Sequence, residues 1–157
     1  MNASQKKILL HAFGNFGRGD DGLGIEFIDK MKQWIEKNNL QSIYTDSSFQ
    51  LNIEHASAMA DHDRVIFVDA SKADILSYSF DQVFPESQHS FTSHSISPSV
   101  LLSVCTELYN RSPLVYLLQI KGYQWEFGEG LSTNALKNLQ IAIEFAKLTI
   151  VDFQNQE

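Results

Sequence analysis

The strongest constraint on the fold is residues 8–25, where an apolar run, a glycine-rich turn and the start of a helix pattern follow one another directly. The apolar run is typical of a buried strand. Glycines in the turn permit backbone conformations that other residues rarely adopt. Open α/β sheets bind ligands at the carboxyl ends of their strands, so this junction predicts a site.

Asp20 and Asp21 distinguish this turn from the glycine-rich turns that bind phosphate. Those turns offer bare amide groups to an anion, often together with a lysine. Here two carboxylates would repel a phosphate, and the spacing Gly-Lys-Ser/Thr is absent. The turn therefore favours a cation. Helix capping is the alternative for either carboxylate, because Asp is preferred at the N-cap and in the first helical turn.

Strand and helix patterns alternate along the rest of the chain. The predicted strands are residues 7–13, 41–45, 64–68, 78–84 and 114–120, of which 78–84 alternates like an edge or antiparallel strand. The predicted helices are residues 22–37, 51–60, 100–109 behind Ser97-Pro98, and a last one from Ser132 to about Ile150. This order predicts a three-layer α/β/α sandwich with a mainly parallel sheet of about five strands.

Composition excludes several classes of protein. The 157 residues contain no linker or repeat, which predicts one domain over residues 1–157. A net charge of -7 without a basic cluster argues against nucleic-acid binding. No apolar stretch reaches the length of a membrane span, and the first residues lack the pattern of a signal peptide. With Cys105 as the single cysteine, we expect a cytoplasmic protein without disulfides.

Two further side chains are candidates for chemistry. Asp69 follows the buried run 65–68, although a turn residue or a helix cap is the alternative explanation for it. His94 lies in a polar loop before a helix, where most histidines are simply exposed. Junctions at the carboxyl ends of parallel strands share one edge of the sheet. A carboxylate of the acidic turn (Asp20 or Asp21), Asp69 and His94 would converge there and form a plausible site for a divalent metal.

Four segments in order resemble the hydrogenase maturation endopeptidases, which trim the large-subunit precursor of nickel–iron hydrogenases. They are Gly-Asn-Phe-Gly-Arg-Gly-Asp-Asp-Gly-Leu-Gly at 14–24, Asp-Arg-Val-Ile-Phe-Val-Asp-Ala at 63–70, Ser93-His94, and residues 120–132. The resemblance implies the α/β/α fold and metal binding through Asp21, Asp69 and His94. It also implies that the protein removes a C-terminal peptide once nickel is in the precursor. Nickel would arrive on the substrate, and other divalent cations could substitute for it.

The resemblance assigns catalysis to Asp21 and Asp69. The metal would polarise the scissile carbonyl or acidify a water, with a carboxylate as base, and the residues do not decide between these routes. A serine or cysteine nucleophile is unsupported, because the chain has no Gly-x-Ser-x-Gly elbow.

Recognition of the precursor is expected around the same edge. Residues 46–54 replace the Gly-Thr-rich loop of many family members, and Phe16 stands where proline or a small aliphatic residue is frequent. We expect Asp20, Phe49, Gln50 and Tyr123 to contact the substrate, with Tyr123 in an aromatic rim. Packing of that rim on its own core is the alternative, and for Asp20 so is a role in shaping the turn.

Two other functions remain open. A non-hydrolytic nickel-binding maturation chaperone would keep the metal ligands and leave the precursor uncut. An unrelated α/β hydrolase or nucleotide-binding fold could hold magnesium at the acidic turn, but only Arg18 is available there for phosphate. The other candidate side chains are expected to be structural: Cys105 in the core, His11 partly buried in its strand, and His55, His62 and His89 at the surface.

Overall fold

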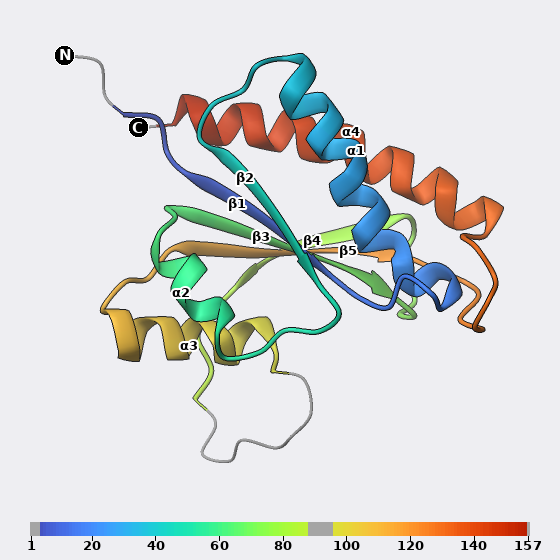
Figure 1. Cartoon of the computed structure of the whole chain (residues 1–157), viewed down its shortest axis with the longest axis horizontal. Helices are drawn as coiled ribbons and strands as arrows, with labels where there is room; N and C mark the ends of the chain where they lie inside the picture. The colour runs from blue at the N-terminus through green and yellow to red at the C-terminus, as the bar shows by residue number, and fades with distance from the viewer. Residues whose placement is uncertain (1–3, 88–95, 157) are drawn as a thin grey trace.

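A five-stranded sheet forms the middle layer of the fold in the computed structural model, which describes residues 4–87 and 96–156 (Figure 1). Its strands are β1 (Ile8–Phe13), β2 (Ile43–Ser48), β3 (Arg64–Ser71), β4 (Tyr78–Val83) and β5 (Leu114–Lys121). They lie in the order β2-β1-β3-β5-β4, and every neighbouring pair is parallel except β4 with β5. The mainly parallel sheet and the antiparallel edge strand confirm the sequence prediction.

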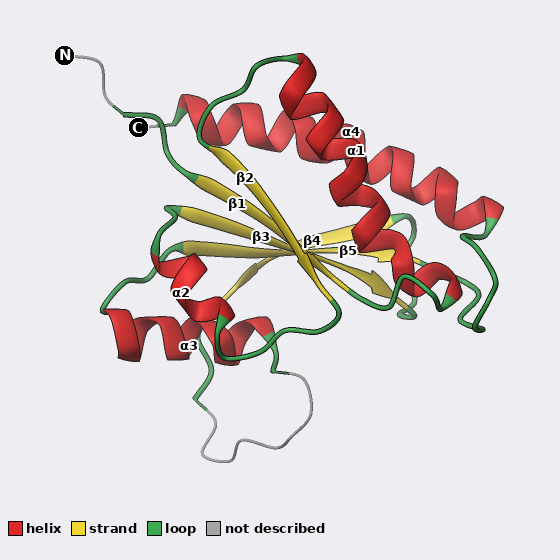
Figure 2. Cartoon of the chain, viewed as in Figure 1, coloured by secondary structure: helices red, strands yellow, loops and turns green. Residues whose placement is uncertain are grey.

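Helices cover both faces of the sheet (Figure 2). One face packs against α1 (Leu23–Lys37) and α4 (Thr133–Asn155), and the other packs against α2 (His55–Ala60) and α3 (Pro98–Tyr109). The strand period of two divides the core between these faces. Ile8 and Leu10 of β1 join the core under α1 and α4, whereas Leu9 joins the core under α2 and α3. The three-layer α/β/α prediction is therefore confirmed.

Hydrogen bonds at the predicted caps fix where two helices begin. The Ser97 hydroxyl accepts from the Val100 amide at 3.2 Å, and the Ser132 hydroxyl accepts from the Ala135 amide at 3.3 Å. Both serines have extended backbone, which is usual at an N-cap.

No helix within the described ranges is long and apolar enough to cross a bilayer.

Several element ends differ from the sequence prediction. The helix predicted over residues 51–60 begins only at His55, because residues 51–54 form a loop and a turn before it. β2 covers residues 43–48 rather than 41–45, and α4 continues to Asn155. β3 continues to Ser71, so Asp69 lies inside the strand instead of after it. The cause is backbone pairing, because β5 matches β3 as far as Ser71 opposite Lys121. Ladder hydrogen bonds extend a strand past its apolar run, which hydrophobicity alone does not reveal.

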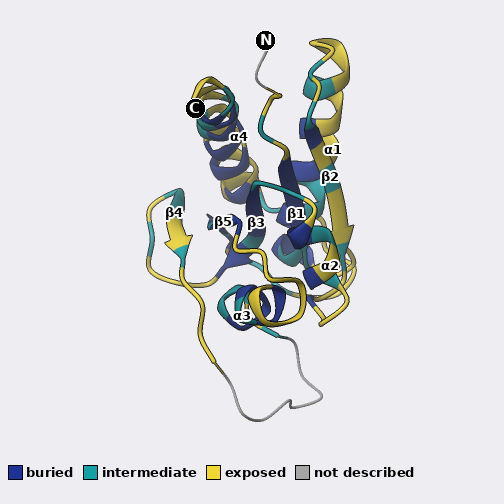
Figure 3. Ribbon diagram, turned by 90° about the vertical axis from the view of Figure 1, so that its left-hand side faces the viewer, coloured by how far each residue is buried: buried dark blue, intermediate teal, exposed yellow. Residues whose placement is uncertain are grey.

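The parallel strands β1, β2, β3 and β5 all end at one edge of the sheet (Figure 2). Three segments meet there: the turn after β1, with its short 3-10 helix Gly19–Gly22, the chain after β2, and the loop after β5. The central strands β1, β3 and β5 are the most buried, and β2 and β4 are more exposed at the sides (Figure 3). Because the central strands are buried along their length, the loops at their carboxyl ends are where a functional site is expected.

Candidate functional site

Asp21 is held at the end of β1 by the glycine-rich turn. The turn folds back so closely that a Cβ on Gly14 would lie 2.2 Å from the carbonyl oxygen of Asp21, and Gly14 has φ +148°. Only glycine fits both demands. The Asn15 amide donates to Asp21 Oδ2 at 2.7 Å, and the Asp21 amide donates to the Arg18 carbonyl at 3.0 Å. The Asp21 carboxylate is therefore fixed by the local fold.

Asp69 lies close enough to Asp21 for the two carboxylates to repel each other. Burial is the main cause that raises the pKa of Asp69, the charge of Asp21 raises it further, and a hydrogen bond from the Ala70 amide opposes both. The resulting pKa is about 7. The structure thus brings together two of the three predicted site residues. A carboxyl group with a pKa near neutrality is a frequent property of functional sites.

The third predicted ligand, His94, lies outside the described residues. Within residues 4–87 and 96–156, no group of three or more His, Cys, Asp or Glu side chains is arranged to hold a metal ion. The pair Asp21 and Asp69 nevertheless suits a divalent cation, because a positive charge between them would relieve the repulsion that raises the pKa of Asp69.

Asp20 has a structural role, as the alternative of shaping the turn allowed, but its partners lie in a distant loop that the sequence did not indicate. Its side chain is 0% exposed and accepts four hydrogen bonds, from the amides of Tyr123, Gln124 and Ser132 and from the Ser132 hydroxyl, at 2.7–3.0 Å. Burial would raise the pKa of Asp20, but these hydrogen bonds outweigh it and lower the pKa below its ordinary value. Asp20 joins the loop after β5 to the turn after β1, and its buried carboxylate does not face a substrate.

The other predicted substrate contacts lie at the carboxyl edge with exposed side chains. Phe49 is 67% exposed and Gln50 is also exposed, both just after β2. Tyr123 is about half exposed, and its hydroxyl accepts from Asn138 Nδ2 at 2.9 Å. These positions are compatible with contact to another protein, and the role of the three residues stays a prediction.

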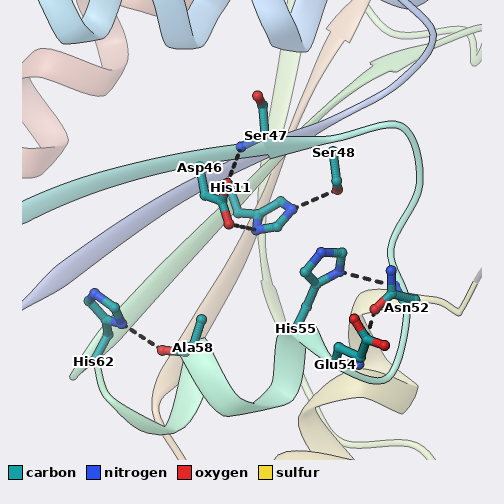
Figure 4. Close-up of polar contacts among 9 residues, drawn as sticks. All are labelled: His11, Asp46, Ser47, Ser48, Asn52, Glu54, His55, Ala58 and His62. Atoms are coloured by element: carbon teal, nitrogen blue, oxygen red, sulfur yellow. Dashed lines mark hydrogen bonds and ion pairs between the residues drawn. The ribbon is translucent and has the colours of Figure 1, made fainter.

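A polar cluster around His11 fixes the point where β2 ends (Figure 4). His11 Nε2 lies 2.8 Å from the Ser48 hydroxyl, and His11 Nδ1 lies 3.8 Å from Asp46 Oδ2. The His55 ring packs edge-on against His11 with centroids 4.5 Å apart. Burial first, and then the charge of His55, lower the pKa of His11 to about 4 although Asp46 opposes them. His11 is therefore neutral at pH 7.

The sequence prediction for these histidines was incomplete. His11 is 1% exposed, so it is more deeply buried than expected, and His55 packs against it instead of lying free at the surface. The pairing register of β1 with β2 explains this, because it sets His11 opposite Asp46, and Ser48 is two residues further along β2 on the same face. Because Ser48 is followed by Phe49 and Gln50, the cluster positions the segment in which recognition was predicted.

Together these features define an α/β/α protein with paired carboxylates at the carboxyl edge of its sheet, and its fold is that of the hydrogenase maturation proteases. The NiFe hydrogenase maturation protease HycI from Thermococcus kodakarensis KOD1 matches with a TM-score of 0.70 and 16% identity, covering 98% of this chain and 96% of that one. The hydrogenase maturating endopeptidase HybD from E. coli matches with a TM-score of 0.71 and 16% identity, covering 93% of each chain.

A third structure with this fold, the hydrogenase 2 maturation peptidase from Thaumarchaeota archaeon SCGC_AB-539-E09, has a TM-score of 0.64 and 16% identity over 92% of this chain and 98% of that one. No protein-family model and no curated protein sequence matches the chain. The solved structures therefore establish the fold that the sequence motifs implied, over nearly the whole chain.

Replacing Asp20 by Ala should lower the free energy of unfolding by about 3–5 kcal/mol, because three amides and a hydroxyl lose a buried charged acceptor at once. Urea denaturation measures this. The control Asp61→Ala removes an exposed carboxylate and should change stability by less than about 0.5 kcal/mol. Equal effects of the two substitutions would contradict the role of Asp20.

Acid should destabilise the protein through His11. The pKa of His11 is about 4 in the folded state and near 6.5 in the unfolded chain, so the unfolded chain binds a proton first as the pH falls. Between pH 7 and pH 4 the wild type should lose about 3 kcal/mol of stability relative to His11→Leu. Ser48→Ala keeps the buried ring and should keep this acid dependence. If the difference in the free energy of unfolding between wild type and His11→Leu did not depend on pH, the lowered pKa of His11 would be refuted.

Asp69 should change the stability with pH in the direction opposite to His11. Its pKa is about 7 when folded and near 3.8 when unfolded, so the folded state loses stability as the pH rises from 3.8 to about 7, and the penalty is fully present at pH 8. Asp69→Asn should therefore raise the free energy of unfolding at pH 8 by on the order of 2–4 kcal/mol, in the presence of a chelator, with little effect at pH 4. Denaturant titrations at the two pH values test this. A destabilised variant at pH 8 would show that Asp69 is not repelled by Asp21.

Proposed function

We propose that this protein is an endopeptidase that removes the C-terminal extension of a nickel-loaded large-subunit precursor of a nickel–iron hydrogenase. The observation that carries the proposal is the placement of Asp21 against Asp69 at the carboxyl edge of the sheet. The fold shared with HycI and HybD supports it, because those proteins are a hydrogenase maturation protease and a maturating endopeptidase. We propose that cleavage occurs in the cytoplasm, the location expected from the sequence.

Nickel enters this proposal as cargo of the precursor. Asp21 and Asp69 supply oxygen ligands, His94 supplies a nitrogen ligand, and the precursor supplies the remaining ones. The repulsion between Asp21 and Asp69 makes an empty precursor a poor partner, because it leaves both carboxylates uncompensated. A loaded precursor brings the missing positive charge. Electrostatics would thereby couple recognition to metal loading, and another divalent cation of similar size would satisfy the same carboxylates.

The proton on Asp69 is the mobile element of the reaction. With a pKa of about 7, Asp69 is close to half protonated at neutral pH in the free protein. A cation beside it lowers that pKa and leaves a carboxylate that can accept a proton from the attacking water. The metal supplies Lewis acidity toward the scissile carbonyl or the water. Asp21 is held by the Asn15 amide and is suited to keep its ligand geometry fixed.

Residues at the edge of the site would select the precursor. Phe49 and Gln50 follow the strand end that His11 and Ser48 hold, and Tyr123 stands on the loop that Asp20 holds. Their exposed side chains flank the carboxyl edge from two different strands. The flat, aromatic character of Phe49 and Tyr123 is typical of protein contact surfaces. We propose that they contact the precursor around its C-terminal extension.

The direct test is cleavage of a nickel-loaded precursor from the same source, read by mass spectrometry of its C-terminus. Wild type should release a peptide only when nickel is present, and Asp69→Asn should release none within the same time. Asp74→Asn, an exposed carboxylate in the chain after β3, is the matched control and should cleave like wild type. Binding without cleavage by wild type would instead identify a nickel-binding maturation chaperone.

A further inference from the structure

A groove of about 340 Å³ lies beside the acidic turn, between the turn after β1 and the loop after β5. Phe16 and Leu131 form apolar walls, Glu26 and Glu129 add carboxylates, and glycines including Gly130 form much of the remaining lining. We call it the Phe16–Leu131 groove. In Figure 1 both segments lie at the same end of the sheet, next to the start of α4. The volume is in the range of small ligand pockets.

Backbone contacts hold the two sides of the groove in place. The Gly19 amide donates to the Glu129 carbonyl and the Gly128 amide donates to the Gly17 carbonyl, both at 3.1 Å. Next to them, the Arg18 guanidinium lies 4.4 Å from the centre of the Phe127 ring. The groove is therefore formed before any partner arrives, and binding there needs little ordering of the chain.

Neither the backbone conformation nor the packing of the protein requires glycine at position 130. Its φ is outside the left-handed range, and a Cβ at this position would meet no atom within 4 Å. Gly14, by contrast, is required by its backbone and by contact with Asp21. A side chain at position 130 would extend into free space without disturbing the fold. The missing side chain keeps that space open for another molecule, since glycine also allows a foreign backbone to approach closely.

We propose that the Phe16–Leu131 groove binds a segment of the substrate protein in which a bulky apolar side chain adjoins a lysine or arginine. Phe16 is 68% exposed, so an apolar occupant would cover it and remove that surface from water. Glu129 has no ion pair among the described residues, and Glu26 has only a surface pair with Lys30 at 3.7 Å. Both carboxylates are thus available to a cation.

The position of the groove connects this proposal to the proposed function, on which it rests for the identity of the substrate. Gly19 and Gly22, which line the groove, flank Asp20 and Asp21 in sequence. A segment seated in the groove would lie against the turn that carries Asp21. The groove would therefore align one part of the precursor while another part reaches the carboxylates, and its contribution would appear in KM rather than in kcat.

The test fills the groove without touching the site. Gly130→Leu should weaken binding of the nickel-loaded precursor about tenfold and raise KM equally with kcat unchanged, the effect of losing one buried apolar contact. Gln33→Leu, which places the same side chain at an exposed position of α1 outside the groove, is the control and should stay within about twofold of wild type. The double variant Glu26→Gln/Glu129→Gln should also raise KM and should reduce its dependence on salt. Normal binding and KM for Gly130→Leu would overturn the proposal.

A second arm needs no cleavage. The blocked peptide Ala-Phe-Arg-Ala should shift the NMR amide signals of Gly17, Gly128 and Gly130 in wild type, and Ala-Phe-Glu-Ala should shift them much less. The peptide Ala-Phe-Arg-Ala should not bind the Gly130→Leu variant. If wild type binds Ala-Phe-Arg-Ala but leaves the precursor uncut, the assignment of the groove is supported and the proposed function is wrong. A change in self-association of Gly130→Leu by sedimentation, with precursor binding unaltered, would assign the groove to contact between copies and overturn the proposal.

Discussion

The buried carboxylate of Asp20 is the interaction on which the carboxyl edge of this protein depends. It receives four hydrogen bonds from a loop more than a hundred residues further along the chain, at distances typical of charge-assisted bonds. Without them, the glycine-rich turn and the loop after β5 would be joined only by a few backbone hydrogen bonds and by the contact of Arg18 with Phe127. Because the turn carries Asp21 and the loop carries Tyr123, one structural carboxylate sets the relative positions of the site and its rim.

Two adjacent aspartates therefore have opposite roles, and their environments decide which is which. Asp20 points into amides that favour its charged form, so its pKa is lowered. Asp69 is buried and lies close enough to Asp21 to be repelled by its charge, and the two effects together raise the pKa of Asp69 to about 7. One residue uses its charge to hold the fold, and its neighbour leaves its charge available to a ligand. A chain that exchanged these environments would lose both the loop and the site.

Local patterns were sufficient to predict most of the fold. Apolar runs, the Ser97 and Ser132 caps and the alternation in β4 all depend on neighbours in sequence, and the structure agrees with them. The proximity of Asp21 and Asp69 also followed from sequence, because parallel strands must end at one edge. The partners of Asp20 and His11 could not be predicted, since they depend on a distant loop and on the register of β1 with β2. Hydrophobic periodicity contains no information on either.

The same sheet holds two ionisable groups with opposing effects on stability. His11 favours the folded state as pH rises between about 4 and 6.5, and Asp69 disfavours it as pH rises between 3.8 and about 7. Their contributions largely cancel over the shared range, so the fold tolerates an energetically unfavourable carboxylate at its edge. A partner that neutralises the Asp69 carboxylate would remove its unfavourable contribution to stability and would leave the contribution of His11 unchanged. Under the proposed function, a cation brought by the precursor would relieve this penalty at neutral pH and so stabilise the folded protein on binding.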